Sequence, residues 1–233
     1  MNAEVSKIRK ERNLKDERYG ILNRLSEEEV LETVKSLNSN LAELTFFGKQ
    51  SDVNDFVDTY IENIYIILDV CARMNLFPDY FFDLVMKKNV GYKGIENRYL
   101  PYDSMEIKKK IANSYKAELQ KNIEYGIENM RFKLHASGKR NINDTFVETA
   151  SFYQKYQLPI GELSDKPFET LKRHDVRFYR YADDLVNADD VVEEVESLVN
   201  MIFEYLSCFV ELGINPTEIL NKCIEEKFSK KMK

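Results

Sequence analysis

The sequence contains few residues that interrupt helices. Its 233 residues include only five prolines and eight glycines, while glutamate, lysine, leucine and isoleucine are abundant. Because proline and glycine end or weaken helices and the abundant residues favour them, this composition predicts an all-α fold, a helical bundle. Hydrophobic residues make up 43% of the chain. That content is sufficient for a buried core, so we do not expect intrinsic disorder.

Cysteine and histidine are also scarce. The three cysteines, Cys71, Cys208 and Cys223, form no C-x-x-C pair and lie within apolar helical patterns. We therefore expect reduced, structural thiols and a cytoplasmic location. His135 and His174 stand alone in the sequence, which gives little support to a histidine-based metal site or catalytic triad. Neither a G-x-G-x-x-G pattern nor a Walker loop is present.

Long apolar runs are missing too. No stretch approaches the roughly 18 consecutive apolar residues of a membrane-spanning helix, and the charged first residues do not resemble a signal peptide. The formal net charge is -6, which disfavours a broad nucleic-acid-binding surface. We therefore expect neither a membrane nor a nucleic acid as a partner.

Apolar residues recur at helical spacing along most of the chain. Ser26 can cap a first long helix, because Glu29 follows three positions later in a capping box. The spacing predicts helices over 26–47, 52–75, 78–88, 104–134, 146–156, 168–187, 189–212 and 216–230. The long segment 104–134 is expected to join two halves.

Two parts of the sequence resemble each other. The turn 75–78, Asn-Leu-Phe-Pro, is matched by the turn 213–216, Gly-Ile-Asn-Pro, and a helix with a lysine-rich end follows each of them. Extended backwards without gaps, this register pairs Asp58 with Glu196, Glu62 with Asn200 and Asp69 with Ser207. The pattern predicts a duplicated helical hairpin. The alternative is a chance similarity between two amphipathic hairpins.

A row of acidic residues marks the first of these hairpins. Asp55, Asp58, Glu62 and Asp69 are spaced so that their side chains lie along one helix face, although the rest of that helix is almost entirely apolar. Acidic side chains on a buried helix should face a pocket, a metal or a cationic partner. The alternative is an exposed acidic face. Carboxylates from the preceding helix could complete an oxygen-rich Mg²⁺ site.

These motifs resemble the all-α nucleoside triphosphate pyrophosphohydrolases, the MazG-like and phosphoribosyl-ATP pyrophosphohydrolase-like superfamily related to dimeric dUTPases. The residues that carry the resemblance are Glu29-x-x-Glu32, the acids at 55–62, the apolar run to Met74, the turn at 75–78 and the Lys-Lys-Asn at 87–89. Asn40 and Thr59 stand where the pattern would have acids if Glu43 and Glu62 are the matching partners. The register of the acids therefore stays open.

The resemblance implies a fold of two MazG-like helical-hairpin repeats, with residues 1–103 as the first, 104–145 as a connecting helix and link, and 146–233 as a degenerate second repeat. It further implies Mg²⁺-dependent release of pyrophosphate from a nucleoside triphosphate, and it allows homo-oligomers. In this interpretation Glu32 and Glu62 are catalytic. The metal ligands come from Glu29, Glu32, Glu43, Asp55, Asp58 and Glu62, and the phosphate contacts from Lys88, Asn89 and Lys93.

Two other functions compete with this one. The first is a noncatalytic MazG-like module that binds a nucleotide or a protein, which would account for the missing acids. In the second repeat, Asn187 and Asn200 replace acids, so the first repeat is the better candidate for activity. The second is a plain helical interaction protein, in which the aromatic residues Phe178, Tyr179 and Tyr181 serve packing or an interface.

Overall fold

The computed structural model describes residues 1–14, 22–47, 53–79, 81–82, 85–86, 117, 140–161 and 167–229, without the side chains of residues 43, 45–47 and 167–169. These residues contain seven α-helices and no strands. The helices are α1 (Asn2–Glu11), α2 (Glu27–Phe47), α3 (Val53–Arg73), α6 (Ile142–Lys155), α7 (Pro167–Val186), α8 (Val191–Leu212) and α9 (Thr217–Ser229). The predicted all-α helical bundle is confirmed.

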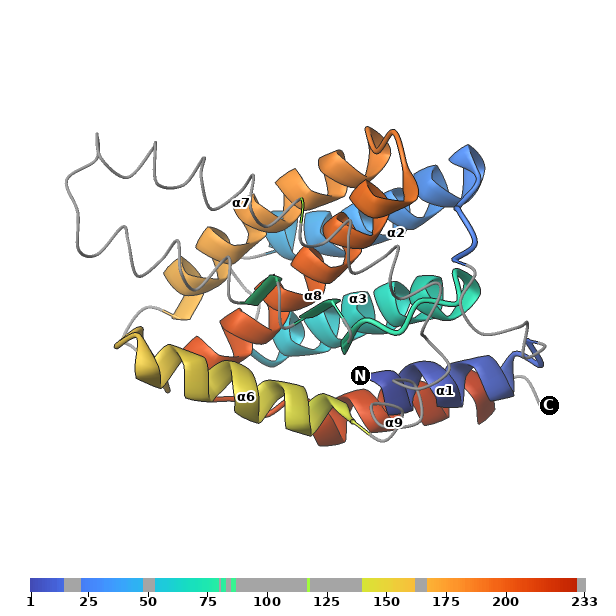
Figure 1. Cartoon of the computed structure of the whole chain (residues 1–233). Coiled ribbons are helices and arrows are strands. Elements are labelled where there is room, and N and C mark those ends of the chain that lie inside the picture. The colour runs from blue at the N-terminus through green and yellow to red at the C-terminus, as the bar shows by residue number, and fades with distance from the viewer. Residues whose placement is uncertain are drawn as a thin grey trace.

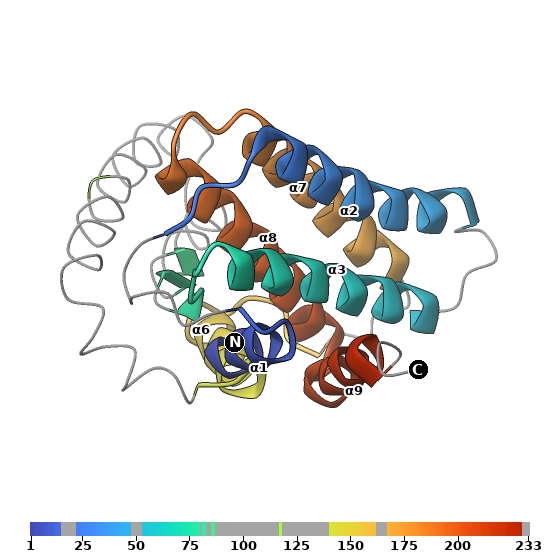
Figure 2. The same cartoon turned by 90° about the vertical axis from the view of Figure 1, so that its right-hand side faces the viewer.

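The helices form three layers (Figures 1 and 2). Helices α2 and α7 make one outer layer, α3 and α8 the middle layer, and α1, α6 and α9 the other outer layer. The middle position explains the composition of α3 and α8, because a helix covered on two sides needs apolar residues around most of its circumference. Every residue of α8 from Ser197 to Leu212 is buried.

Side chains at the helix ends fix where several helices begin. Ser26 and Glu29 form the predicted capping box of α2: the Ser26 amide donates to Glu29 Oε2 (2.9 Å) and the Glu29 amide donates to Ser26 Oγ (3.3 Å). Asn141 and Asp144 form a second capping box at α6. Asp190 caps α8 by accepting from two backbone amides of its first turn. These bonds satisfy amides that have no partner within a helix.

Most of the predicted helices are confirmed, with each end within four residues of its predicted position. They are α2, α3, α6, α7, α8 and α9. Helix α1 was not predicted, since the sequence around it is strongly charged. The predicted connecting helix 104–134 lies outside the described residues apart from residue 117. Six of the eleven residues of the predicted helix 78–88 are described, and five of these, 79, 81, 82, 85 and 86, are helical.

The turns after α3 and α8 have the same backbone geometry. Asn75 (φ 59°) and Gly213 (φ 71°) both adopt the left-handed conformation. The next amide donates back into the helix in each case, from Leu76 to the Cys71 carbonyl (2.8 Å) and from Ile214 to the Phe209 carbonyl (2.9 Å). This is the hydrogen bond of a Schellman motif. The two turns therefore share their backbone geometry as well as their place in the proposed repeat.

The segments that follow these turns cross to the opposite half of the molecule. Helix α9, which follows α8, packs on α3, where Phe228 lies 6.5 Å from Tyr65 between ring centroids. Phe82, which follows the turn after α3, lies 6.1 Å from Phe203 of α8. The two halves therefore share one core. Within the described residues, no helix combines the length and the apolar character needed to cross a membrane.

Candidate functional site

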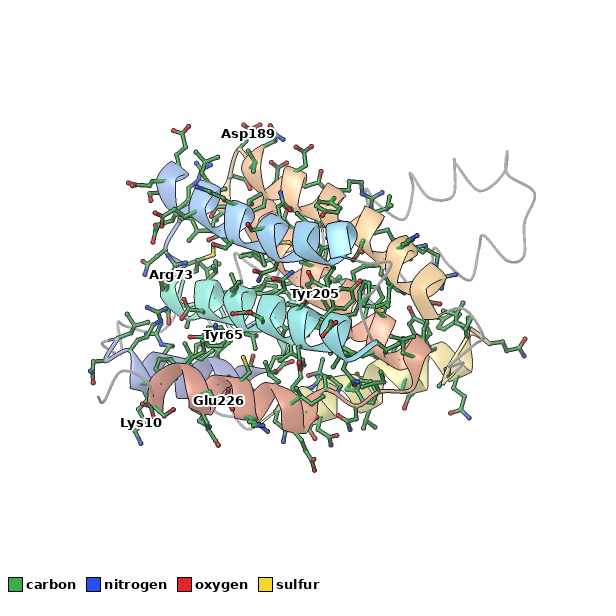
Figure 3. The ribbon with its side chains drawn as sticks, turned by 180° about the vertical axis from the view of Figure 1, so that it is seen from behind. Lys10, Tyr65, Arg73, Asp189, Tyr205 and Glu226 are labelled. Carbon is green, nitrogen blue, oxygen red and sulfur yellow. The ribbon has the colours of Figure 1, made fainter. Side chains whose placement is uncertain are left out.

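Glu29 is held by groups of its own chain. Besides its capping contacts with Ser26, it accepts a hydrogen bond from Arg73 Nη1 at 2.7 Å. Arg73 lies at the end of α3, beside the first turns of α2 (Figure 3). The hydrogen bond from the Ser26 amide, together with the Arg73 charge, lowers the pKa of Glu29. Glu29 thus caps α2 and joins α2 to α3.

Glu32 is exposed and lies one turn further along α2. It borders a shallow surface hollow together with Glu28, Leu31 and Lys35. No acid from the described part of α3 lines this hollow. The described surroundings of Glu32 therefore offer no second carboxylate from the facing helix.

Glu29 and Glu62 lie at different levels of the hairpin that α2 and α3 form. Asn40 donates to Asn63 Oδ1 at 2.7 Å, which places the second half of α2 beside the middle of α3. Glu29 precedes Asn40 by eleven residues, or about 16 Å at roughly 1.5 Å per residue. Glu62 is the neighbour of Asn63. The structure therefore does not bring Glu29 and Glu62 together.

Asp58 and Glu62 border a groove between α3 and α9. Lys222, Lys227 and Glu226 of α9 line the same groove. Lys227 Nζ donates a hydrogen bond to Glu62 Oε1, and this bond raises the pKa of Lys227. Figure 3 labels one residue of each helix near this groove, Tyr65 on α3 and Glu226 on α9. The predicted catalytic carboxylate Glu62 therefore meets an ammonium group.

The remaining acids of the α3 row have different surroundings. Asp55 and Asp58 are exposed, at the start of the helix. Asp69 lies further along the same face and is 8% exposed. It accepts a hydrogen bond at 2.6 Å from Nη2 of Arg12, the residue that follows α1. The row follows the boundary between α3 and the layer of α1 and α9. Two acids of the row therefore have a cationic partner within the chain: Glu62 is paired with Lys227, and Asp69 is paired with Arg12.

The fit of the expected Mg²⁺ to these residues is poor. Among the described residues, no three Asp, Glu, His or Cys side chains come close enough to hold a metal ion. The side chain of Glu43 lies outside the described part of the chain, and so do Lys88, Asn89 and Lys93. Three of the predicted ligands, Asp55, Asp58 and Glu62, do share one helix face.

A second group of charges lies buried between α7 and α8. Glu204 of α8, only 2% exposed, lies 2.6 Å from His174 Nδ1 and accepts from Arg177 Nη1 at 3.0 Å. Glu211, seven residues later, is paired with Arg173 and lies 3.3 Å from His174 Nε2. These two carboxylates are therefore balanced by two arginines around one buried histidine.

Polar side chains also connect the middle layer to the layer of α2 and α7. The amide chain from Asn40 through Asn63 continues to the Tyr205 hydroxyl, which accepts from Asn63 Nδ2 at 2.8 Å. Tyr60 of α3 donates to Asp175 of α7. Burial raises the pKa of Asp175, although the hydrogen bond from Tyr60 opposes the change. These contacts fix the register of the core helices.

The group around His174 was not predicted from the sequence. Glu204 and Glu211 interrupt the apolar helix α8 seven residues apart, much as the acidic row interrupts α3. Arg173 and Arg177, four residues apart on the preceding helix, are the complementary signal. Buried acids on an apolar helix require cationic partners, so this pattern could have identified the cluster.

The chain matches no protein-family model, and searches of curated proteins and of solved structures find no match either.

Proposed function

We propose that this protein is a noncatalytic, MazG-like helical module that binds a protein partner. The observation that supports the proposal is the pairing of the expected site residues. Glu29 is paired with Arg73, and Glu62 is paired with Lys227. A carboxylate already neutralised by an internal cation is a weak ligand for a divalent ion, since the ion must first displace that cation.

The charge of the groove between α3 and α9 favours a protein over a free nucleotide. Its three carboxylates, Asp58, Glu62 and Glu226, outnumber its two ammonium groups, Lys222 and Lys227. Three negative and two positive charges leave a formal charge of -1. An anionic groove repels a triphosphate unless metal ions screen the charge.

The proposed scaffold is a tandem duplication of one helical hairpin. The matched turns at Asn75 and Gly213 are 138 residues apart, and Val53 and Val191 begin α3 and α8 at the same offset. The amides of Phe82 and Leu220 both donate to a proline carbonyl four residues earlier, at 2.9 Å. A chance likeness of two amphipathic hairpins would not be expected to preserve the start of a helix, its end and the following turn in one register.

The first test is pyrophosphate release from a panel of standard and modified nucleoside triphosphates with Mg²⁺. We expect no release above background from the wild type. Lys227→Gln, which frees Glu62, serves as a second variant and should be equally inactive. Mg²⁺-dependent release by the wild type that disappears in Glu62→Gln would contradict the proposal.

The second candidate function is the Mg²⁺-dependent nucleoside triphosphate pyrophosphohydrolase. The observation in its favour is that Asp58, Glu62 and Glu226 line one groove. For a metal to bind there, Lys227 would have to move away and the three carboxylates would have to move closer together, since no three acidic side chains of the described residues now lie close enough to hold an ion. Release of pyrophosphate that increases in Lys227→Gln and is lost in Glu62→Gln would favour this function.

A further inference from the structure

The outer layer of α2 and α7 carries most of the exposed large apolar side chains of the described residues. Four side chains contribute: Leu31 is 51% exposed, Val176 71%, Tyr179 37% and Val186 41%. Leu31 lies on α2 and the other three on α7, and the two helices pack against each other. Among the described helices, the neighbours of this layer are α3 and α8, on its inner side (Figure 2).

Four of the exposed residues of α7 form a row along the helix, and Arg173, Arg180 and Asp184 are exposed beside it. Lys172, Val176, Tyr179 and Asp183 follow one another at intervals of four, three and four residues, which places them on one face of the helix. The core face of α7 is different and carries buried residues such as Phe178. All four members of the row are exposed.

The row is complementary to itself when it is reversed. Its midpoint lies between Arg177 and Phe178, so two antiparallel copies place Lys172 opposite Asp183 and Val176 opposite Tyr179. Each of these contacts then occurs twice, as in an interface with a twofold axis. An apolar centre with oppositely charged ends fits a second copy of α7 in both composition and charge.

We infer that a second copy of this chain docks on the α7 face, with the two α7 helices antiparallel. Tyr179 supplies a large ring at the centre of the contact, where aromatic residues contribute most. Leu31 and Val186 are further exposed apolar side chains of the same layer. This contact is separate from the groove between α3 and α9, so it forms whether or not that groove is catalytic.

The test is the molar mass of the full chain in solution as a function of concentration, measured by sedimentation equilibrium. We expect the mass to rise toward twice the 27.5 kDa of one chain. Val176→Asp should remain monomeric over the same range, because it places a charge at the centre of the contact. Val147→Asp is the matched control: Val147 is 52% exposed on α6, outside this layer, and the variant should dimerise like the wild type.

A charge reversal tests the antiparallel register separately. Lys172→Glu and Asp183→Lys should each weaken dimerisation by about tenfold, since each places like charges together twice. The double variant restores opposite charges and should recover the wild-type dissociation constant. A monomeric wild type at every concentration, equal effects of the Val176 and Val147 variants, or a double variant weaker than both single variants would overturn the inference.

Discussion

Removing the negative charge of Glu204 should strongly destabilise the fold. The substitution Glu204→Gln keeps the size of the side chain but leaves Arg177 without its buried carboxylate and removes the charged partner of His174 Nδ1, while Glu211 remains 3.3 Å from His174 Nε2. Breaking a buried ion pair by removing one partner typically costs about 3–5 kcal/mol of unfolding free energy.

The surroundings of the cluster place the expected loss at the lower end of this range. The side chain of His174 is 2% exposed and cannot regain water, whereas that of Arg177 is 31% exposed and can do so in part. We therefore expect a loss of about 3 kcal/mol. For a chain of this size each kcal/mol lowers the melting temperature by roughly 2–4 °C, which predicts a decrease of about 6–12 °C.

The assay is thermal unfolding followed by circular dichroism, with Glu225→Gln as the control. Glu225 forms an ion pair with Lys7, but its side chain is 68% exposed, so its loss should cost no more than about 0.5 kcal/mol. If Glu204→Gln lowers the melting temperature no further than Glu225→Gln does, the buried cluster does not stabilise the protein as argued.

Three further predictions concern local stability. Glu29→Ala removes the capping contacts with Ser26 and should lower the free energy of unfolding by about 1 kcal/mol at pH 7, measured by urea unfolding. Because the pKa of Glu29 is lowered from 4.5 in the folded protein, the difference in unfolding free energy between the wild type and the variant should become smaller as the pH falls below 4.5. Asp175→Asn removes a buried carboxyl group whose pKa is raised above 3.8 in the folded protein. The wild type should therefore lose stability relative to this variant as the pH rises above 3.8, and parallel curves of unfolding free energy against pH would contradict this. Gly213→Ala should cost more than about 1 kcal/mol by thermal unfolding, because Gly213 has φ +71° and an added Cβ would lie 2.9 Å from Gly161 Cα.

The sequence predicts the helices best where a periodic apolar pattern meets a clear cap. The start of α2 follows from Ser26 and Glu29, and the end of α8 from Gly213. Helix α1 lacks such a signal, because its ten residues carry few apolar side chains, with Val5 and Ile8 among the buried ones. Its position depends on packing against α3, which local sequence does not encode.

The candidate site is harder to predict because its partners are distant in sequence. Helical spacing correctly places Asp58, Glu62 and Asp69 on one face of α3. It does not reveal what lies opposite that face. Lys227 is 165 residues from Glu62, and Arg12 is 57 residues from Asp69. Only the packing of α9 and α1 on α3 makes these side chains neighbours.

The crossed packing of α9 on α3 also has a consequence for synthesis. When α3 leaves the ribosome, the residues that cover Tyr65 have not yet been made, because Phe228 follows 163 residues later. The apolar side of α3 must therefore stay exposed, or be shielded by a chaperone, until translation of this segment is complete. Contacts between residues so far apart in the sequence also form slowly. We therefore expect the nascent chain to become resistant to proteases only after the last turn of α9 has been made and has packed on α3.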